Sequence, residues 1–435
     1  MNHFQVGIGR ADITPPIGTL LMGYTPPRPC ESIHDRLNIT VFVFADGDTR
    51  ALIASADLCN IKGEASVNVR KAMAEAANVP YENCIIACTH THSGPHTVRD
   101  PDEPPCFIRS ILIPAAAEAA REAAANLKPA LMGYGTVESN VAINRRQLRE
   151  DGKVLLGQNP YGPMDHTMTV IAFREPDGTP IGNLIHYGCH NTGSGRNTAV
   201  TRDWCGVAVD RLESLSKGVT AFINGGAGDC GPRLANGGTT GNLAMALELG
   251  GQAACDAAQA FRSIRQWHTP RLHTIHDIIR LPLNNTDTPE ALLAEAAKLG
   301  DPETLTGTML FNYNSLTERA ERLLNGEVPE EAMDIPHTAI CLDTLALLGM
   351  PFEPFSLVTL RVKDASPFLH TLCVGYANGS MSYFPSADQL IRGGYEVRMF
   401  RSFHHTPFTD DAEQYYLTGC LDLLRRLHGK TTNNE

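Results

Sequence analysis

The sequence predicts an α/β fold in which a mixed, mainly parallel central sheet is flanked by helices. Three observations lead to this prediction. Short apolar runs rich in β-branched residues alternate with longer patterns of helical period, several of the runs lack the polar alternation of a half-exposed strand, and no repeat or low-complexity tract divides the chain. With 435 residues, of which 43% are hydrophobic, we expect one compact unit over residues 1–435.

The elements follow from these patterns in chain order. The runs that indicate buried strands are residues 37–44, 50–56, 84–88, 167–173, 219–223 and 369–376. The helical patterns are residues 64–77, 111–126, 203–216, 242–264 and 411–427. Residues 288–336 are helical in pattern and charged, and we expect them to form an insertion or cap. The sequence does not indicate whether this segment closes over a pocket. Functional groups in open α/β sheets collect beyond the carboxyl ends of strands, so the site is expected there.

Charge and composition exclude several classes of partner. The net charge of −12 and the pI of about 5.7 disfavour binding to nucleic acid and to anionic membranes. No segment has the roughly 18 to 20 apolar residues of a membrane span, and the first residues do not resemble a secretory leader. We therefore expect a cytoplasmic protein with a small-molecule substrate, and the sequence leaves homo-oligomerisation open. The 12 cysteines lack paired CxxC spacing, which argues against a disulfide framework and a four-cysteine zinc site.

The clearest chemical signal is a His-Thr-His segment at the end of the predicted strand 84–88. Strand alternation places His90 and His92 on one face, and two adjacent imidazoles are suited to binding zinc. The alternative is a hydrogen-bonded pair of histidines in a turn. The spacing alone would also allow both histidines to bind the same ion.

A second apolar run, residues 181–190, also ends in histidine. His190 is the second candidate ligand, whereas His186 lies inside the strand and is expected to be a core residue. Asp203 stands at the start of a predicted helix, where the cap of that helix is at least as good an interpretation as a catalytic role.

Three further loops carry candidate residues. The glycine-rich loop after strand 219–223 contains Gly228, a candidate for binding substrate through its backbone, and Asp229, a candidate catalytic residue, although a tight structural turn explains the loop equally well. Glu353 lies between aromatic and proline residues, where a buried carboxylate would need a metal or another partner. Asn378 and Tyr383 lie in the same later loop. Asn378 is a candidate for substrate binding, and Tyr383 is a candidate for metal binding or catalysis. The alternative for Glu353 is an exposed turn, and the alternative for Tyr383 is a half-buried aromatic residue with a packing role.

Taken together and in this order, the segments resemble the neutral ceramidase family, specifically the N-terminal catalytic domain of neutral/alkaline non-lysosomal ceramidases. The resemblance extends over nearly the whole chain. The segments that carry it are GIGRADITPP at 7–16, IHDRL at 33–37, SADL at 55–58, HTHSGP at 90–95, residues 144–145, the run ending at His190, residues 228–229 and GGYE at 393–396. The resemblance implies one zinc ion per chain bound by His90, His190, Glu353 and Tyr383. It also implies that His92 lines the pocket and transfers protons, and that Arg145 binds a substrate oxygen or carboxylate.

The sequence departs from the family at the nucleophile. Family members carry serine in a Gly-Asp-x-Ser-Pro run, whereas Gly231 occupies that position here and Cys230, one residue earlier, is best explained as a buried thiol. The additional C-terminal β domain of secreted ceramidases has no counterpart in this sequence. We therefore expect a zinc-dependent hydrolase that cleaves a small polar amide with metal-activated water, with Tyr383 stabilising the oxyanion.

Other functions stay open at this stage. Esterase or lactonase activity needs the same residues, and a non-catalytic protein that binds a metal or a small molecule would explain the missing serine. An amidohydrolase barrel and a metallo-β-lactamase fold also place His-x-His at strand ends. Both fit less well, because eight regular βα units are not apparent and Gly94 stands where the second fold needs aspartate.

Overall fold

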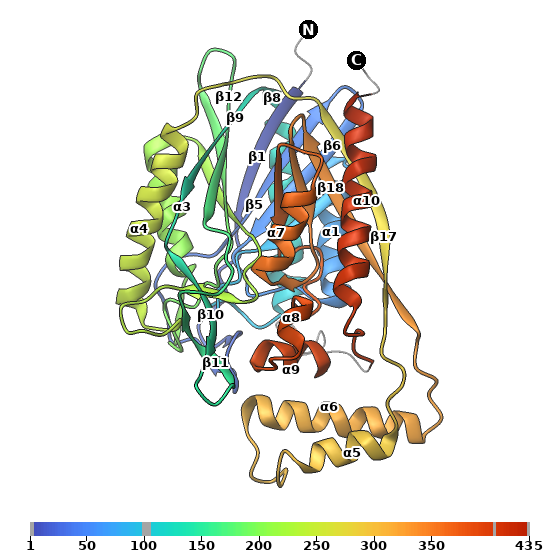
Figure 1. Cartoon of the computed structure of the whole chain (residues 1–435). Coiled ribbons are helices and arrows are strands. Elements are labelled where there is room, and N and C mark those ends of the chain that lie inside the picture. The colour runs from blue at the N-terminus through green and yellow to red at the C-terminus, as the bar shows by residue number, and fades with distance from the viewer. Residues whose placement is uncertain (1–3, 98–105, 403–405, 433–435) are drawn as a thin grey trace.

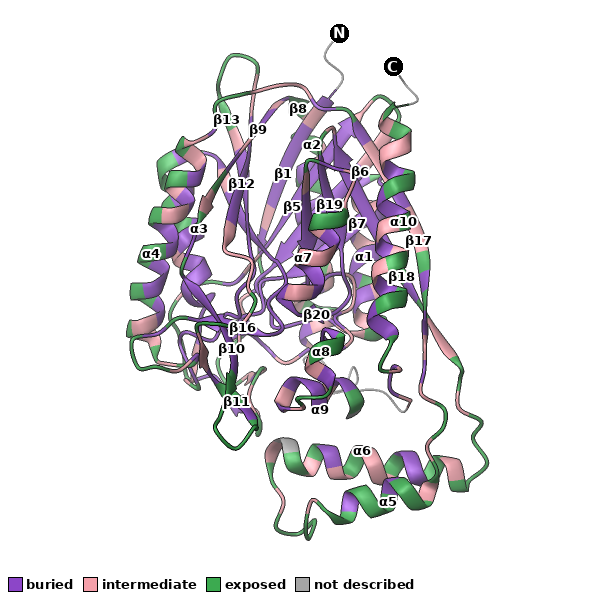
Figure 2. Cartoon of the chain, in the orientation of Figure 1, coloured by how far each residue is buried: buried purple, intermediate pink, exposed green. Residues whose placement is uncertain are grey.

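The computed structural model describes residues 4–97, 106–402 and 406–432, and it is organised around three larger β-sheets. The inner faces of these sheets contribute apolar side chains to one shared core, and helices cover the outer face of each sheet (Figures 1 and 2). Every predicted strand and helix is present with ends that agree within two residues, except that the last helix runs on to Thr432.

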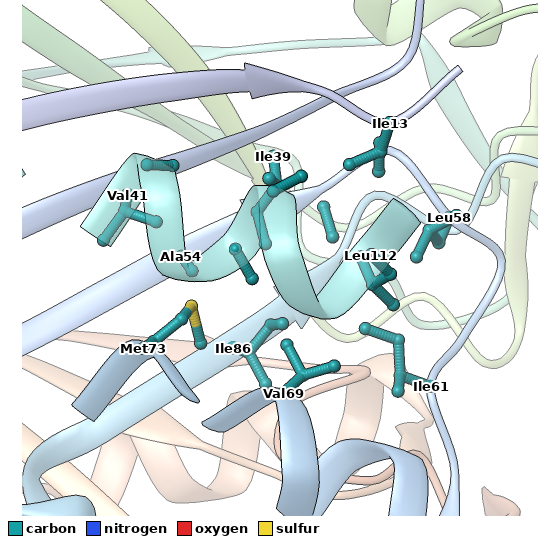
Figure 3. Close-up of a cluster of buried hydrophobic side chains, with 14 of the residues drawn as sticks. Ile13, Ile39, Val41, Ala54, Leu58, Ile61, Val69, Met73, Ile86 and Leu112 are labelled. Carbon is teal, nitrogen blue, oxygen red and sulfur yellow. The ribbon is translucent and has the colours of Figure 1, made fainter. Parts of the chain in front are cut away.

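The first sheet has the strand order β7-β6-β5-β1-β8. Its strands are β1 (Phe4–Asp12), β5 (Asn38–Asp46), β6 (Thr49–Ala56), β7 (Cys84–Cys88) and β8 (Lys128–Pro129). Helices α1 (Gly63–Ala77) and α2 (Ile113–Ala125) cover its outer face, where Ile39, Val69 and Ile86 pack in one apolar cluster (Figure 3). A side chain at Gly7 would place a Cβ 2.0 Å from the carbonyl oxygen of Ala123, so this glycine lets α2 lie directly on β1.

The second and third sheets repeat this arrangement. The second, in the order β15-β13-β12-β9, carries two helices on its outer face, and the third, in the order β17-β18-β19-β21, carries two others. The second contains β9 (Leu131–Glu138), β12 (Thr167–Arg174), β13 (Pro180–Tyr187) and β15 (Val219–Asn224), with α3 (Asp203–Ser216) and α4 (Leu243–Arg262). The third contains β17 (Leu272–Pro282), β18 (Ala332–Leu342), β19 (Leu345–Gly349) and β21 (His370–Val374), with α7 (Ser356–Ala365) and α10 (Ala412–Thr432).

Short elements complete the chain. They are β2 (Leu20–Leu21), β3 (Arg28–Pro29), β4 (Ser32–Ile33), β10 (Ala142–Leu148), β11 (Val154–Asn159), β14 (Ala199–Val200), β16 (Cys230–Pro232), β20 (Glu353–Pro354), β22 (Tyr383–Phe384), α8 (Ala387–Leu390) and α9 (Tyr395–Ser402), with a 3₁₀ turn at Tyr81–Asn83 and a π-helical turn at Ile108–Leu112. None of the helices in the described part of the chain is long and apolar enough to cross a membrane.

The prediction of a single, mainly parallel central sheet is wrong. Each large sheet has one parallel pair at an edge, β6 with β7, β13 with β15, and β19 with β21, and its other pairings are antiparallel. The strands are buried on both faces because helices pack outside them and the other sheets pack inside. Burial on both faces is typical of parallel sheets, but here it follows from the layering.

The three parallel pairs meet at their carboxyl ends. The backbone N–H of Gly375, just after β21, donates to the carbonyl of Asn224 at the end of β15 (2.9 Å). The N–H of Cys88, the last residue of β7, donates to the carbonyl of Tyr376 (3.3 Å). The loops that follow these edge strands are therefore held against one another, and they carry the candidate residues.

A helical hairpin projects from the third sheet. Helices α5 (Pro289–Ala297) and α6 (Gly307–Leu324) connect β17 to β18 and lie at the bottom of Figure 1, next to α9, which α6 contacts. Their outer surfaces are largely exposed (Figure 2). The helical part of the predicted insertion 288–336 ends earlier than expected, because residues 332–336 are already paired with β17 as part of β18.

Candidate metal centre and active site

His90 stands two residues beyond the end of β7, in a left-handed backbone conformation with a φ of 69°. Its Nδ1–H donates to the carbonyl of Cys59 (2.7 Å), and its ring stacks on that of Tyr376 at a centroid distance of 4.1 Å. Burial lowers the pKa of His90 well below 6.5, so the ring is neutral. The backbone hydrogen bond fixes the tautomer that leaves the Nε2 lone pair available to a ligand.

His190 is presented in the same way beyond the end of β13. Its Nδ1–H points to the carbonyls of Ala227 (2.7 Å) and Cys230 (3.1 Å), and burial lowers its pKa well below 6.5. The loop after it is ordered by Asp203, whose carboxylate accepts hydrogen bonds from the backbone of Gly193 (3.0 Å) and Ser194 (2.7 Å). Asp203 is thus a structural residue at the start of α3, which agrees with the non-catalytic interpretation of this position.

Glu353 joins the two histidines from the third sheet. It follows β19 and pairs with Tyr383 in the short parallel bridge of β20 with β22. Its Oε2 lies 3.5 Å from Nε2 of His90 and 3.5 Å from Nε2 of His190. Ligand atoms of the three side chains, one from each, all lie within 4.8 Å of one another.

The three side chains are suited to a metal ion. Within the described chain, Nε2 of His190 and Oε2 of Glu353 are buried polar atoms with no hydrogen-bond partner, a costly arrangement unless a cation binds between them. Two neutral imidazoles and one carboxylate, with the histidine Nδ1 atoms bonded to carbonyls, form the ligand set and outer contacts of many catalytic zinc sites. His90, His190 and Glu353 are therefore brought together as predicted.

A second group of potential ligands, Cys59, His90 and His92, overlaps the first. Sγ of Cys59 lies 3.8 Å from Nδ1 of His90, the nitrogen that already donates to a carbonyl. Burial also raises the pKa of the Cys59 thiol well above its ordinary value, which disfavours the thiolate that zinc prefers. The geometry favours the group that contains Glu353.

His92 lies beside the metal group and faces the pocket. Its Nε2 is 3.1 Å from Nε2 of His90, and burial lowers its pKa to about 4. Gly23, with a φ of +103°, lies against its ring, and a Cβ there would approach Cγ of His92 to 2.4 Å. Glycine is thus needed at position 23 because the backbone there is left-handed and because a side chain would collide with the ring of His92. No motif in the sequence indicated this role.

Tyr383 is held in place by charged and polar neighbours. The guanidinium of Arg145 donates to its hydroxyl oxygen (3.0 Å) and to the carbonyl of Gly228 (2.9 Å), and also pairs with Glu396 (3.0 Å). Glu396 accepts a second hydrogen bond from Arg146 (2.7 Å), so its buried carboxylate is clamped between two cations. Arg145 does not line the pocket, and the structure favours an indirect action through Tyr383 over direct substrate contact.

Three other predicted residues also make contacts within the protein. The N–H of Gly228 donates to the carbonyl of Pro354 (2.9 Å), and the side chain of Asn378 holds the backbone of β7, accepting from the N–H of Ile86 (2.9 Å). Asp229 accepts hydrogen bonds from the backbone N–H of Ser356 (2.7 Å), the first residue of α7, and from Asn144 (3.1 Å). None of these three residues is in the described lining of the pocket, and their roles toward substrate stay predictions.

The position of the missing serine is sterically closed. Gly231 lies in β16, and a Cβ at this residue would approach Cβ of Thr239 to 2.7 Å. Cys230 is fully buried, its Sγ lies 3.1 Å from the hydroxyl of Ser356, and burial raises the pKa of its thiol well above the ordinary value. Neither residue offers a nucleophile, which agrees with the interpretation of Cys230 as a buried thiol.

The metal group opens into a pocket of about 210 Å³. Its described lining is Met22, Gly23, Tyr24, Thr25, Pro27, Cys59, Asn60, Lys62, His90, His92, His96, Glu353, Ser382, Tyr383, Tyr395 and Met399. No sequence signal indicated Tyr24 or Lys62, which come from loops without a motif. Tyr395 lies inside the GGYE segment at 393–396, so its place in the pocket was available only through the resemblance.

Comparisons with known proteins agree with this geometry. A family profile of the N-terminal domain of neutral/alkaline non-lysosomal ceramidases matches residues 4–260. Neutral ceramidase B from Dictyostelium discoideum is 28% identical in an alignment of 260 positions that covers 53% of this chain and 36% of that protein, so the match spans only about a third of this relative. The crystal structure of neutral ceramidase from Pseudomonas aeruginosa matches with a TM-score of 0.75 at 21% identity, over 99% of this chain and 75% of that one. A ceramidase complexed with C2 matches with a TM-score of 0.74 at 20% identity, over 99% and 76% of the two chains, and both matches show the fold.

Proposed function

Because the chain belongs to the neutral/alkaline non-lysosomal ceramidase family, we propose that it is a zinc-dependent hydrolase that cleaves the C–N bond of a small polar amide with metal-activated water. The observation that carries the proposal is the convergence of His90, His190 and Glu353 beside a pocket that His90 and Glu353 line, with Nε2 of His190 and Oε2 of Glu353 left without a hydrogen-bond partner in the described chain. These three side chains would hold one zinc ion per chain, and Tyr383 would be the fourth ligand or act beside it. When bound, zinc supplies Lewis acidity, which lowers the pKa of water toward about 7 and polarises a carbonyl.

His92 is the residue placed to move protons. Its buried imidazole is neutral, lies next to His90 and borders the pocket. A neutral imidazole accepts a proton from the attacking water and delivers it to the nitrogen of the departing amine.

Tyr383 is placed to stabilise negative charge on the carbonyl oxygen of the substrate. Arg145 donates to the phenol oxygen, and the ring of Tyr395 packs edge-on against that of Tyr383 at a centroid distance of 5.7 Å, so the group is held at the pocket wall before substrate binds. Arg145 is accordingly a positioning residue in this proposal.

The choice of a small polar amide has two supports. The pocket of about 210 Å³ is small, and its lining has histidine, tyrosine, lysine and asparagine side chains. Amide cleavage follows from the family, whose name-giving members are ceramidases, and an esterase or lactonase would use the same groups. A non-catalytic role is favoured by a single observation, the closed position at Gly231.

Metal analysis of purified variants tests the site. We expect stoichiometric zinc in the wild type and loss of zinc in His90→Ala and in His190→Ala, because each removes one of three protein ligands. His186→Gln is the matched control, since His186 is also buried at the end of β13 but bonds only the carbonyl of Cys373 (2.9 Å), and it should keep its zinc.

Turnover of a panel of small amides, esters and lactones tests the reaction. The amides should be hydrolysed by the zinc-loaded wild type and not by the two ligand variants. Retention of zinc by either ligand variant would overturn the ligand assignment. Stoichiometric zinc without turnover of any panel member would overturn the hydrolase and leave the non-catalytic alternative.

A further inference from the structure

The charged groups that line the pocket are unevenly distributed. Among the lining residues that the structure describes, Glu353 is the single carboxylate and Lys62 is the single lysine or arginine. In the proposed function the carboxylate of Glu353 binds a divalent cation. The loaded pocket then carries excess positive charge, although the chain as a whole has a net charge of −12.

Lys62 is the fixed cation of this pocket. It is the N-cap residue of α1, with an extended backbone, so its position is set by the start of a 15-residue helix whose N-terminal end is itself electropositive. Burial lowers the pKa of its ammonium group to about 8, and the carboxylate of Glu353 is the largest opposing influence. Lys62 also lines the same pocket of about 210 Å³ as His90 and Glu353, so its side chain shares this cavity with the metal group.

Binding of a metal ion changes the surroundings of Lys62. A cation held by Glu353 weakens the attraction between that carboxylate and the ammonium and adds repulsion, in a region partly shielded from water. An anionic group that enters the pocket with the substrate is attracted by both the ammonium and the bound cation. Electrostatics thus favours an anion at the Lys62 side while the scissile bond lies at the metal side.

Two further cations contact residues that line the pocket. Arg28 donates to the carbonyl of His92 (3.0 Å), and Arg145 donates to the hydroxyl of Tyr383 (3.0 Å). Glu396 compensates Arg145, whereas Arg28 has no carboxylate partner within the described chain. Arg28 is 7% exposed, so its charge is only weakly screened by solvent.

We propose that the natural substrate is an amide that carries a carboxylate close to the scissile bond, as N-acyl amino acids do, and that Lys62 binds this carboxylate. The inference rests on the proposed hydrolase function and names its substrate class. One ammonium in a pocket of about 210 Å³ suits a carboxylate, whereas phosphate groups are usually bound by several donors at once. Hydrolysis then breaks the C–N bond, adds the water oxygen to the acyl carbon and leaves the proton on the amine of a free amino acid.

A matched pair of substrates tests the proposal with the zinc-loaded full chain. N-acetylglycine and N-acetylglycinamide differ only in the carboxylate, and the wild type should have the higher kcat/KM for N-acetylglycine. In Lys62→Met this preference should fall by between about tenfold and a hundredfold, mostly through KM, and Lys62→Arg should restore part of it. Lys71→Met, at an exposed position of the same helix, is the control and should keep the wild-type preference.

Binding without turnover separates this inference from the proposed function. Levulinate replaces the amide N–H of N-acetylglycine by CH2, and calorimetry should show that it binds the wild type and binds Lys62→Met between about tenfold and a hundredfold more weakly at equal zinc content. If neither acetyl compound is hydrolysed but levulinate binding depends on Lys62, the hydrolase fails and carboxylate recognition stands. If hydrolysis occurs without a preference for the carboxylate, or with a preference that survives Lys62→Met, the inference is overturned. Absence of levulinate binding in the wild type also overturns it.

Discussion

Backbone conformations that L-residues rarely adopt are concentrated around the metal group. His90, Tyr376 and Asn378 have φ values of 69°, 55° and 52°, and each follows the end of a parallel edge strand. Such conformations persist only where neighbouring contacts enforce them. Here the N–H of His90 donates to Leu58 (2.9 Å) and that of Tyr376 to Phe352 (2.8 Å), so the turns that aim the ligand are held by backbone bonds to other segments.

Asp229 gives a prediction about pH at the residue scale. Burial raises the pKa of its carboxyl group to about 7 in the folded protein, from an ordinary value of 3.8. The folded state therefore binds this proton more tightly between about pH 4 and pH 7, so the contribution of Asp229 to stability falls as the pH rises through that range, by at most about 4 kcal/mol. Asp229→Asn removes the titration, and its free energy of unfolding should decrease less between pH 4.5 and pH 8 than that of the wild type.

Urea unfolding of both proteins with a chelator present measures this difference without interference from metal binding. Other buried carboxyls, such as Asp57, titrate equally in the two proteins and cancel. Equal pH dependence in the two proteins would show that Asp229 is ionised in the folded state across the whole range.

The sequence predicted which residues carry the metal chemistry better than it predicted which residues face the pocket. His90 and His190 follow apolar runs that composition alone makes recognisable, whereas Glu353 was assigned as a ligand through the family resemblance. The direction of a side chain in a loop depends on contacts with distant segments. Asp229 and Asn378 are therefore close in sequence to residues of the site, but their side chains accept hydrogen bonds from backbone N–H groups of α7 and β7.

At the scale of elements, the α5–α6 hairpin is attached by one strand pair. Pro282 pairs with Ala332 at the end of β17 and β18, and the N–H of Leu283 donates to the carbonyl of Glu331 (2.9 Å). The two points where the hairpin leaves the sheet are thus adjacent. Its contact with the rest of the molecule includes α9, the helix that supplies Tyr395 and Met399 to the pocket.

This attachment predicts the effect of deleting the hairpin. Replacement of residues 286–330 by Asn-Gly should close β17 and β18 with a tight turn and change the free energy of unfolding by only about 1 kcal/mol. Zinc content should stay at the wild-type level, because no metal ligand lies in the deleted part, whereas KM should rise severalfold because α9 loses a neighbour. Chemical unfolding, metal analysis and steady-state kinetics check the three expectations, and an unchanged KM would show that the insertion is not a cap.

The elements that the sequence predicted are present, but others, among them β1, β18, β19 and α7, were not predicted, and neither was the pairing of the strands. Apolar runs mark β5 and β6 as buried, yet the two strands are antiparallel and joined by a tight turn, and the same hydrophobic pattern fits a parallel pair. Strands such as β9 and β17 were missed because polar residues interrupt them and part of each strand is exposed. Sheet order depends on which inner faces share the core, and that information is distributed over the whole chain.

At the scale of the molecule, the metal group draws one ligand from each of the three sheets. His90 follows β7, His190 follows β13, and Glu353 follows β19, and each of these strands belongs to a different sheet. A bound ion therefore adds a direct link between three layers that also contact one another through apolar side chains and a few hydrogen bonds.

Removal of the metal should accordingly lower global stability. At free zinc one hundred times the dissociation constant, binding to the folded state alone adds on the order of 3 kcal/mol. Calorimetry should show a Tm that rises by a few degrees with zinc and falls again with a chelator in the wild type, and that is insensitive to both in His190→Ala. A Tm in the wild type that does not depend on zinc would contradict the bridging role.

The meeting of three sheet edges at one point also sets when the site is made. The ligands are far apart in the chain, so none of the contacts between them is local, and such contacts form late because long loops must be closed first. During synthesis the two histidines emerge well before Glu353, and a partly made chain can offer no complete set of ligands. If the proposed site binds its ion, capture is confined to molecules whose three sheets have already docked, and metal content would then measure how many copies have finished folding.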